Sequence, residues 1–532
     1  MNGTVYVVGS GPAGVSCARA LLDRGARVVM LDAGNRLEAD KALAVERLGS
    51  GSPEDFDPRL LAFVKENMPA SPEGVPLKVS FGSDFPYRGH DTFLPMEAPA
   101  FAALPSLALG GLGNVWGASM LPVLQDDIDD WPISLADLAP HYAAVLSFVP
   151  LGAARDRLAS THPLYSDRYG TLCPSRQVAS FMKDLEASAE ALAAEGIAFG
   201  ASRLAVRAQP DGEGQGCVYC GLCMYGCPYA AIYNPATTVE QLRRRDSFTY
   251  LDRVVVERVV EGDGRIRIEA VSMVDGSNVT FDADRVYLAA GVLPTTRILL
   301  HSMGAYDVPV TLKDSQYYLI PLLRYRMPGG VERERLHTLA QAFIEIRDGR
   351  IADRSVHLQV YSYNDLLPKA VGAFLGPVAR IAAPAISQVV GRLLIVQGYL
   401  HSDLSSEVKA TLRSPRGGVR PTLQIEVRPV PATRRAISGV LAKLMRNRRH
   451  LKAVPVTPLA KTALAGRGYH SGGTFPMAAS PSPFQSDRLG RPVGFTRIHA
   501  VDSSVLPSIP ATTITLTVMA NAHRIGSAYD GR

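Results

Sequence analysis

Apolar and polar positions form the clearest pattern at the start of the chain, where two apolar runs flank a segment with helical spacing. Val5–Val8 leads into a glycine-rich turn and a helical pattern, and a second apolar run, Val28–Leu31, follows. Short apolar runs predict buried strands, and the helical spacing between them predicts a crossover helix. The pattern therefore predicts a βαβ unit and, with it, a parallel sheet.

The turn inside this unit reads Gly9-x-Gly11-x-x-Gly14, and the second strand ends on Asp32. Gly9 permits a tight turn, Gly11 lets the backbone approach a pyrophosphate, and Gly14 lets helix and strand pack closely. An acid about 20 residues further on is typical of a side chain that hydrogen-bonds a ribose hydroxyl. The unit therefore predicts a dinucleotide site, without selecting the dinucleotide.

Later periodicity predicts a second crossover and an antiparallel sheet. A buried strand from Val286 ends at Gly291 before a helical pattern, and residues 250–283 alternate like an inserted meander. Residues 35–100 show no clean period and are expected to cover the nucleotide. Between 311 and 455 we interpret five alternating runs as an antiparallel substrate domain with one covered face. These runs are Tyr318–Tyr325, Leu339–Ile346, His357–Tyr363, Leu393–His401 and Leu423–Val430.

Composition and charge narrow the class of protein. The chain has 532 residues, 47% hydrophobic and 20% charged, which suits a folded protein of two or more domains. The net charge of +6 is spread along the chain, and the clusters Arg243–Arg245 and Arg446–Arg449 are typical of solvated helix faces. We therefore expect no nucleic-acid partner. No signal-like segment precedes the first strand, so we expect a cytoplasmic location.

A second glycine-rich stretch contains Gly110, Gly111, Asn114 and Trp116. Its glycines suggest close approach of the backbone to a planar or phosphorylated group. A plain loop explains these residues equally well.

Four of the six cysteines lie together as Cys217-x2-Cys220-x2-Cys223-x3-Cys227-Pro. This is the spacing with which thiolates wrap an iron–sulfur cluster. Four clustered thiolates also suit tetrahedral zinc, which stays the alternative. Disulfides are not expected, because such close neighbours pair only with strain and no secretory signal is present.

Together these segments resemble the glucose-methanol-choline (GMC) oxidoreductases, a family of flavoproteins. The resemblance rests on the N-terminal fingerprint, the Gly110–Trp116 stretch, Asp130-Trp131-Pro132, Leu288–Gly291 and the C-terminal region. It covers most of the chain, more loosely between 311 and 455. It implies an α/β fold, with a Rossmann-type FAD-binding domain and an interleaved α+β substrate domain built on an antiparallel sheet. The implied parts are 1–310 with a cysteine segment near 215–235, a substrate domain at 311–455, and a return to the FAD domain at 456–532.

The same resemblance implies the site residues. His470 falls on the family's active-site histidine, and Asp502 begins a segment near the flavin. Thr513 stands where the family normally has His or Asn, and its hydroxyl donates one hydrogen bond but is a poor base. The implied catalytic residues are His470 and Thr513. The implied cofactor-binding residues are Gly9, Gly11, Gly14, Asp32, Gly110, Gly111, Asn114, Trp116, Val255, Ala290, Gly291 and Asp502.

Part of this family, the sugar dehydrogenases with a cysteine-bound cluster beside FAD, has a similar motif that ends in Cys-Pro. The resemblance implies a [4Fe–4S] or [3Fe–4S] cluster held by Cys217, Cys220, Cys223 and Cys227. Because the last cysteine of such a run can serve another cluster, Cys173 is an alternative fourth ligand.

The implied activity is that of a dehydrogenase acting on a sugar or other alcohol. His470 would take the hydroxyl proton, the carbon would pass hydride to the flavin, and Thr513 would orient the oxygen. Electrons would leave through the cluster to an acceptor protein or a quinone. Two alternatives stay open: a redox-neutral flavoprotein of the lyase or isomerase type, and an electron-relay subunit with a structural metal site.

The substrate is the feature that the sequence determines least. The apolar stretch Leu366–Leu393 predicts two short helices buried against the sheet. Alternatively, it forms a lid that rests on a membrane surface and admits an amphiphile, such as a lipid-linked sugar or a long-chain alcohol. Prolines and arginines interrupt the stretch, so we do not expect a membrane-spanning helix.

Overall fold

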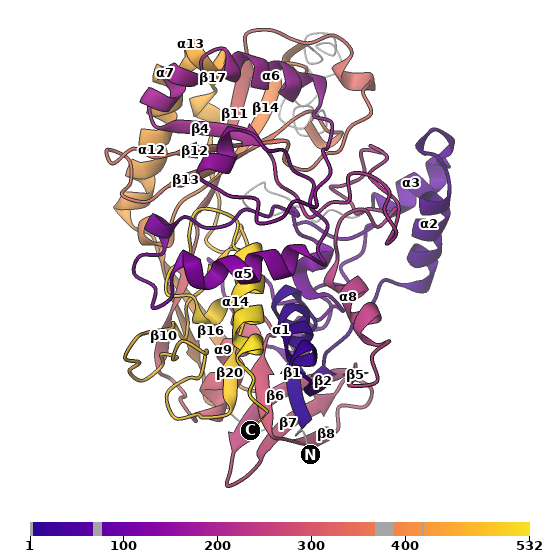
Figure 1. Cartoon of the computed structure of the whole chain (residues 1–532), viewed down its shortest axis with the longest axis vertical. Helices are drawn as coiled ribbons and strands as arrows, with labels where there is room; N and C mark the ends of the chain where they lie inside the picture. Colours follow the sequence, from indigo (N-terminus) through magenta and orange to yellow (C-terminus); the bar gives the residue numbers. More distant parts are fainter. Residues whose placement is uncertain (1–3, 67–76, 368–387, 416–419, 532) are drawn as a thin grey trace.

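A five-stranded parallel sheet organises one end of the molecule (Figure 1). The computed structural model describes residues 4–66, 77–367, 388–415 and 420–531. In spatial order the strands are β20 (Ile498–Ala500), β9 (Arg285–Leu288), β1 (Thr4–Val8), β2 (Arg27–Leu31) and β5 (Phe248–Leu251). All four neighbouring pairs are parallel. The predicted βαβ unit and the second crossover, from β9 into α9 (Val292–Ser302), are both confirmed.

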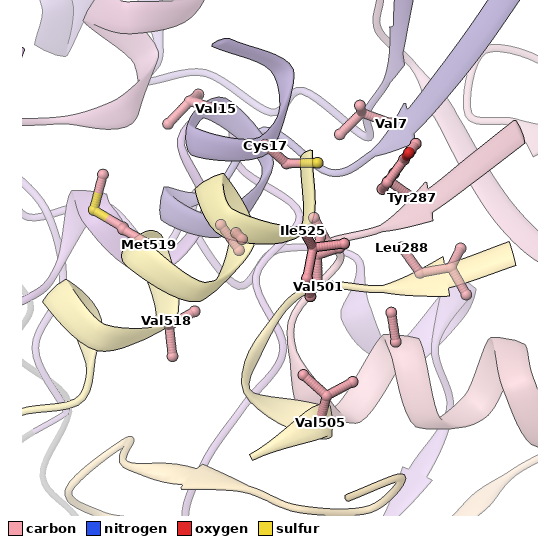
Figure 2. Close-up of a cluster of buried hydrophobic side chains, with 14 of the residues drawn as sticks. Val7, Val15, Cys17, Tyr287, Leu288, Val501, Val505, Val518, Met519 and Ile525 are labelled. Atoms are coloured by element: carbon pink, nitrogen blue, oxygen red, sulfur yellow. The ribbon is translucent and has the colours of Figure 1, made fainter. Parts of the chain in front are cut away.

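Helices from opposite ends of the chain pack together beside this sheet. They are α1 (Pro12–Asp23) and α14 (Thr515–Ser527). Figure 2 shows Cys17, Met519 and Ile525 within the buried cluster between them and the sheet. The helices approach so closely that a Cβ added at Gly526 would lie 2.9 Å from the carbonyl oxygen of Cys17. Cys17 is fully buried and acts as a small core residue.

An antiparallel sheet forms the other end of the molecule (Figure 1). In spatial order its strands are β17 (Ala453–Pro455), β11 (Tyr317–Arg324), β14 (Leu393–Tyr399), β13 (Val356–Tyr361), β12 (Ala342–Ile346) and β4 (Ile197–Ala201), with β18 (Lys461–Thr462) also pairing with β11. One face packs on helices α6 (Arg176–Glu186), α7 (Ala189–Ala194), α12 (Pro431–Arg446) and α13 (Arg448–Leu451). The expected antiparallel substrate sheet with one covered face is therefore present.

The boundaries expected at residues 310 and 455 do not separate the two layers. β4, α6 and α7 come from the first 310 residues yet belong to the substrate sheet and its helical cover. Conversely, the expected substrate strand β16 (Leu423–Arg428) lies in a second sheet with β10 (Pro309–Asp314), β15 (Glu407–Leu412), β19 (Ser471–Gly472) and β3 (Met96–Glu97). The reason is packing, because Leu312, Val408 and Ile425 of this sheet join the same core as the nucleotide-binding strands.

The remaining helices and strands lie outside the sheets and helices described above. They are α2 (Ala39–Ser50), α3 (Pro58–Val64), α4 (His90–Phe93), α5 (Leu135–Leu146), α8 (Pro235–Leu242) and the meander β6 (Val254–Glu261), β7 (Ile266–Ser272) and β8 (Asn278–Ala283). The expected meander is confirmed. The stretch without a clean period holds the helices α2 and α3, which project from the body of the molecule (Figure 1).

Among the described residues, no helix has both the length and the apolar character needed to cross a membrane. Most of the stretch for which a membrane lid was an alternative, residues 368–387, lies outside the described residues.

Candidate active site

A cavity of about 1520 Å³ lies between the parallel sheet and the antiparallel sheet. Its floor is formed by the glycine-rich turn after β1, the stretch around Trp116 and the start of α9. Its wall is formed by β11, β13 and β14. The C-terminal region adds His470, Asp502 and Thr513. Residues from both ends of the chain therefore meet in one chamber.

The three fingerprint glycines have different surroundings. An added Cβ would lie 2.6 Å from the carbonyl oxygen of Ala289 at Gly9, and 2.0 Å from that of Gly9 at Gly14. At Gly11 it would meet nothing within 4 Å, because this backbone faces the open cavity. Gly9 and Gly14 thus allow close packing, and Gly11 leaves space at the start of α1 for a pyrophosphate.

Asp32 joins two loops at the cavity floor. Its carboxylate accepts hydrogen bonds from the Ser10 hydroxyl at 2.5 Å and the Tyr250 hydroxyl at 2.9 Å. Ser10 in turn accepts a hydrogen bond from the Gly110 amide. Burial raises the pKa of Asp32 to about 6, while the two hydroxyl donors oppose that shift. Asp32 lines the cavity at the end of β2, as its spacing predicted.

The second glycine-rich stretch is a shaped part of the floor. The Asn114 side-chain amide donates to the carbonyl oxygens of Leu109 and Gly111 and holds the turn. Gly111 and Trp116 line the cavity, whereas Gly110 and Asn114 support them from outside its lining. The expected contact residue Val255 also lies outside the lining, in a small apolar cluster beside Ala33, Leu94 and Leu107.

Asp502 fixes the start of α9. Its carboxylate accepts hydrogen bonds from the Gly291 amide at 2.9 Å and the Thr295 hydroxyl at 2.5 Å. Burial raises the pKa of Asp502, and these donors counteract the shift. Ala290, Gly291 and Asp502 all line the cavity, so the structure brings this predicted set together.

His470 lies deep in the cavity next to the substrate sheet. Its ring centre is 4.8 Å from that of Tyr399, and its Nδ1 is buried without a hydrogen-bond partner among the described residues. Burial, with a smaller effect of His357, lowers the pKa of His470 to about 3. The imidazole is therefore neutral at neutral pH, which is the form that accepts a proton.

Thr513 lines the same cavity, but its hydroxyl donates to the carbonyl oxygen of Ser119 at 3.2 Å. A hydroxyl has one proton, and that of Thr513 is used in the bond to Ser119. The Thr513 oxygen is therefore available to other groups only as a hydrogen-bond acceptor.

The strand register sorts the inner face of the substrate sheet into rows of decreasing polarity. The row beside His470 contains Tyr317, Tyr399, His357 and Glu345. The next row contains Leu319, Gln397, Gln359 and Phe343, and the third contains Pro321, Ile395 and Tyr361. The last contains Leu323 and Leu393. The wall is thus polar near His470 and mostly apolar farther along the strands.

The four clustered cysteines line a second, smaller pocket. Burial raises the pKa of Cys217 and Cys220 to about 12, and the neighbouring thiols add to the shift. The Thr338 amide donates to the sulfur of Cys223 at 3.5 Å. Cys173 is exposed and is not among the residues lining this pocket. Among the described side chains, no group of three or more Cys, His, Asp or Glu is arranged to hold a metal ion.

His337 belongs to the wall of this cysteine pocket, a position that no sequence motif predicts. It is buried, its Nδ1 has no partner among the described residues, and burial lowers its pKa to about 4. The next residues connect the two cavities, because Leu339 lines both of them. His337 lies far from the cysteines in sequence, so local spacing carried no signal for it.

Two family models match the chain. The GMC oxidoreductase model matches residues 406–522, and a model of NAD(P)-binding Rossmann-like domains matches residues 7–39. A search of the curated proteins found no match. Among solved structures, pyridoxine 4-oxidase from Mesorbium loti is similar over 99% of each chain, with a TM-score of 0.59 and 15% sequence identity. That similarity shows a shared fold.

The Rossmann-type floor, the antiparallel wall and the matched C-terminal region define a GMC-type architecture. The C-terminal part of the chain, residues 406–522, is therefore similar to GMC oxidoreductases, and the whole chain shares its fold with pyridoxine 4-oxidase.

Proposed function

We propose that the protein is a dehydrogenase that oxidises a hydroxyl group of a sugar or related alcohol, and that its electrons leave through an iron–sulfur cluster at the four-cysteine pocket. The shared wall of the two cavities is the observation that supports electron transfer through the cysteine pocket. Leu339 lines both, and Met224, next to Cys223, lines the large one. An electron carrier in the cysteine pocket would thus be a neighbour of the reacting groups.

The cavity floor fits FAD. Gly11 presents open space at the start of α1, Asp32 lies at the end of β2, and Gly291 and Asp502 face the same chamber. These residues would hold the nucleotide, the pyrophosphate and the flavin end of the cofactor. FAD, when bound, supplies a two-electron acceptor for the hydride of the substrate C–H bond.

His470 is the proposed base. It is neutral, enclosed and has an unpartnered ring nitrogen, so it has the capacity to take the hydroxyl proton as the carbon loses hydride. The alcohol thereby loses two electrons and two hydrogens and becomes a carbonyl. Thr513 contributes an acceptor oxygen and so positions a hydroxyl without moving its proton.

The shared position of four thiols in one pocket is what supports a thiolate-bound cluster. Backbone amides of Tyr219, Leu222 and Thr338 point at the sulfurs of Cys217, Cys220 and Cys223. Four neighbouring thiolates would repel one another, and iron would compensate that charge as it displaced the thiol protons. Such a cluster, when bound, supplies one-electron transfer to an acceptor protein or a quinone.

The position of Lys78 supports the closeness of the two sites. Lys78 lines the large cavity and donates to the carbonyl oxygen of Trp116 at 2.8 Å. Burial lowers its pKa to about 8, and the charge of Cys223 acts in the opposite direction. A cation at this position favours electron-rich groups on both sides.

The outer rows of the substrate sheet favour an apolar extension of the substrate. Leu319, Leu323, Leu393 and Ile395 line the cavity beyond the polar row. A sugar or alcohol carried on an apolar chain, taken from a membrane surface, would place that chain along these residues.

Anaerobic purification tests the proposal. We expect flavin absorbance with a broad iron–sulfur shoulder, together with iron and acid-labile sulfide. Sugars, nucleotide sugars, glycolipids and long-chain alcohols are then screened for anaerobic bleaching of the flavin, followed by reoxidation with quinones or with oxygen. Zinc without iron would contradict the cluster. Bleaching by dithionite but by no alcohol would favour a redox-neutral enzyme, and reoxidation by oxygen alone would favour an oxidase.

A further inference from the structure

Beside the cavity lining, on the same face of the substrate sheet, lies a buried pair of side chains that the proposed mechanism does not use. His357 of β13 and Glu345 of β12 are cross-strand neighbours, and both are almost completely buried. The His357 Nδ1 is 2.5 Å from the Glu345 carboxylate. A buried carboxylate is costly unless it is paired, so this pair holds His357 in a fixed orientation.

The pair also fixes which histidine nitrogen carries a proton. Nδ1 faces a carboxylate, which accepts hydrogen bonds only, so Nδ1 carries a proton. The other ring nitrogen, Nε2, lies 3.2 Å from the Gln359 side-chain amide. The Tyr361 hydroxyl donates to the Gln359 oxygen at 3.0 Å. The Gln359 amide is therefore held between His357 and Tyr361.

Gln359 keeps unused hydrogen-bonding capacity in this arrangement. An amide side chain has two N–H donors and an oxygen with two lone pairs, so one donor and one lone pair remain. The cross-strand neighbour Gln397 accepts from the Tyr399 hydroxyl at 3.4 Å, and neither of its donors has a partner among the described residues. Both glutamines line the cavity. Buried polar groups are satisfied by a partner, and here the partner is whatever fills the cavity.

The position of the two amides relative to His470 defines what they can bind. Gln397 lies two residues from Tyr399 on the same face of β14, and the Tyr399 ring packs against His470. Two residues along a strand span about 7 Å. The amides therefore lie one strand repeat beyond the proposed base, within reach of a hydroxyl near the one that is oxidised.

We propose that Gln359 and Gln397 are specificity-determining residues that bind further hydroxyl groups of a polyhydroxylated substrate, and that His357 and Glu345 are positioning residues for Gln359. The inference rests on the proposed function of the cavity as an alcohol-oxidising site. A substrate with hydroxyls beside the reacting carbon satisfies both amides, whereas a simple alcohol leaves them unpaired. Sites that lose such pairing reject the analogue strongly, so we expect a preference on the order of 10²-fold or more.

Matched probes test this preference directly. A panel of octyl glycosides is compared with octanol, so that the apolar chain is constant and only the hydroxyl-bearing head differs. Anaerobic stopped-flow measurements give the rate of flavin reduction and its half-saturating concentration. In the wild type the best glycoside should exceed octanol by on the order of 10²-fold in their ratio. Gln397→Leu and Gln359→Leu should remove most of that advantage, because the glycoside loses a hydrogen-bonding partner while octanol no longer leaves that amide unpaired.

Two more variants separate hydrogen bonding from shape and position. Leu319→Ala changes the cavity in the same row without removing a hydrogen bond, so it should change glycoside and octanol kinetics by a similar factor. Glu345→Gln removes the carboxylate that fixes His357. It should raise the half-saturating concentration for the glycoside with little change in the limiting rate. A merely structural role would instead lower the stability of the protein and lower the rates of flavin reduction by the glycoside and by octanol to a similar extent.

Binding without turnover keeps the two proposals apart. Trp116 lines the cavity, so its fluorescence reports octyl glycoside binding even if no flavin is reduced. Weaker glycoside binding in Gln397→Leu supports the inference independently of catalysis. Equal binding by this variant and the wild type, or equal use of octanol and every glycoside, would overturn it. Failure of every alcohol to reduce the flavin would instead count against the proposed function.

Discussion

The floor and the wall of the large cavity use different parts of the chain to meet their ligands. The floor is made largely of backbone at glycines, and the buried acids Asp32 and Asp502 hold its segments together as well as facing the cavity. The wall is made of side chains from neighbouring strands, arranged in rows by the register. A cofactor with constant structure suits a backbone cradle, whereas a wall of exchangeable side chains suits the part that selects the substrate.

Two histidines illustrate how a pocket decides a role. His470 lies in a glycine-containing segment of the large cavity, and His337 lies on the wall of the cysteine pocket. In each ring Nδ1 is buried without a partner among the described residues, and burial lowers the pKa. A lowered pKa alone therefore does not assign a role to either histidine. The other groups in each pocket distinguish His470, the proposed base, from His337, the neighbour of the proposed cluster.

The largest effect is expected at the floor, where two glycines of one fingerprint should respond differently. Gly14→Ala places a Cβ 2.0 Å from a backbone oxygen, so it should prevent accumulation of the folded flavoprotein. Gly11→Ala meets no protein atom and has a φ of −65°, so the chain should fold with a nearly unchanged melting temperature but retain less FAD. Thermal unfolding and flavin content measure both. Equal stability of the two variants would contradict the assigned packing roles.

The next effect concerns the proposed base. His470→Ala should keep its FAD and lower the rate of anaerobic flavin reduction by about 10²- to 10⁴-fold, the usual contribution of a positioned base. Bound flavin, measured by absorbance, is the control for folding. A wild-type reduction rate in this variant would remove His470 from the proton transfer.

Two cysteine variants compare the pocket with the surface. Cys223→Ser removes a buried thiol that accepts an amide hydrogen bond, and it should lower iron and sulfide content and slow electron transfer to quinones. Cys173→Ser changes an exposed thiol outside the pocket and should leave both quantities unchanged. Loss of iron in Cys173→Ser would instead make it the remote fourth ligand.

The smallest expected effect is a nearly flat pH profile. The pKa of His470 is lowered to about 3, so the neutral form needed for proton acceptance persists from alkaline pH down to mildly acidic pH. Flavin reduction should therefore show no acidic limb near the ordinary histidine pKa of about 6.5. Acid should also lower the free energy of unfolding. Below a pH of about 6.5 the His470 side chain binds a proton in the unfolded chain but not in the folded protein, so protonation favours the unfolded state. A limb near 6.5 would indicate a solvated base.

The sequence by itself determined the elements whose meaning is local. The fingerprint glycines, Asp32 and the strand periods are set by backbone geometry and burial within one βαβ unit. In the structure Gly9, Gly11 and Asp32 line the cavity, and Gly14 packs against Gly9. The antiparallel substrate sheet followed from alternation for the same reason. The polar positions His357, Gln359 and Tyr361 already alternated along one predicted strand, although the chemistry of that face was not evident from one strand.

Tertiary structure decided everything that depends on distant segments. Packing moved β4 into the substrate sheet and β16 out of it, because burial of their apolar faces depends on which core is nearest. Register brought Gln359 beside Gln397, and the fold brought His337 to the cysteines and the Thr513 proton to Ser119. Such contacts join residues far apart in the chain, and no local period or spacing encodes which distant groups will share a pocket.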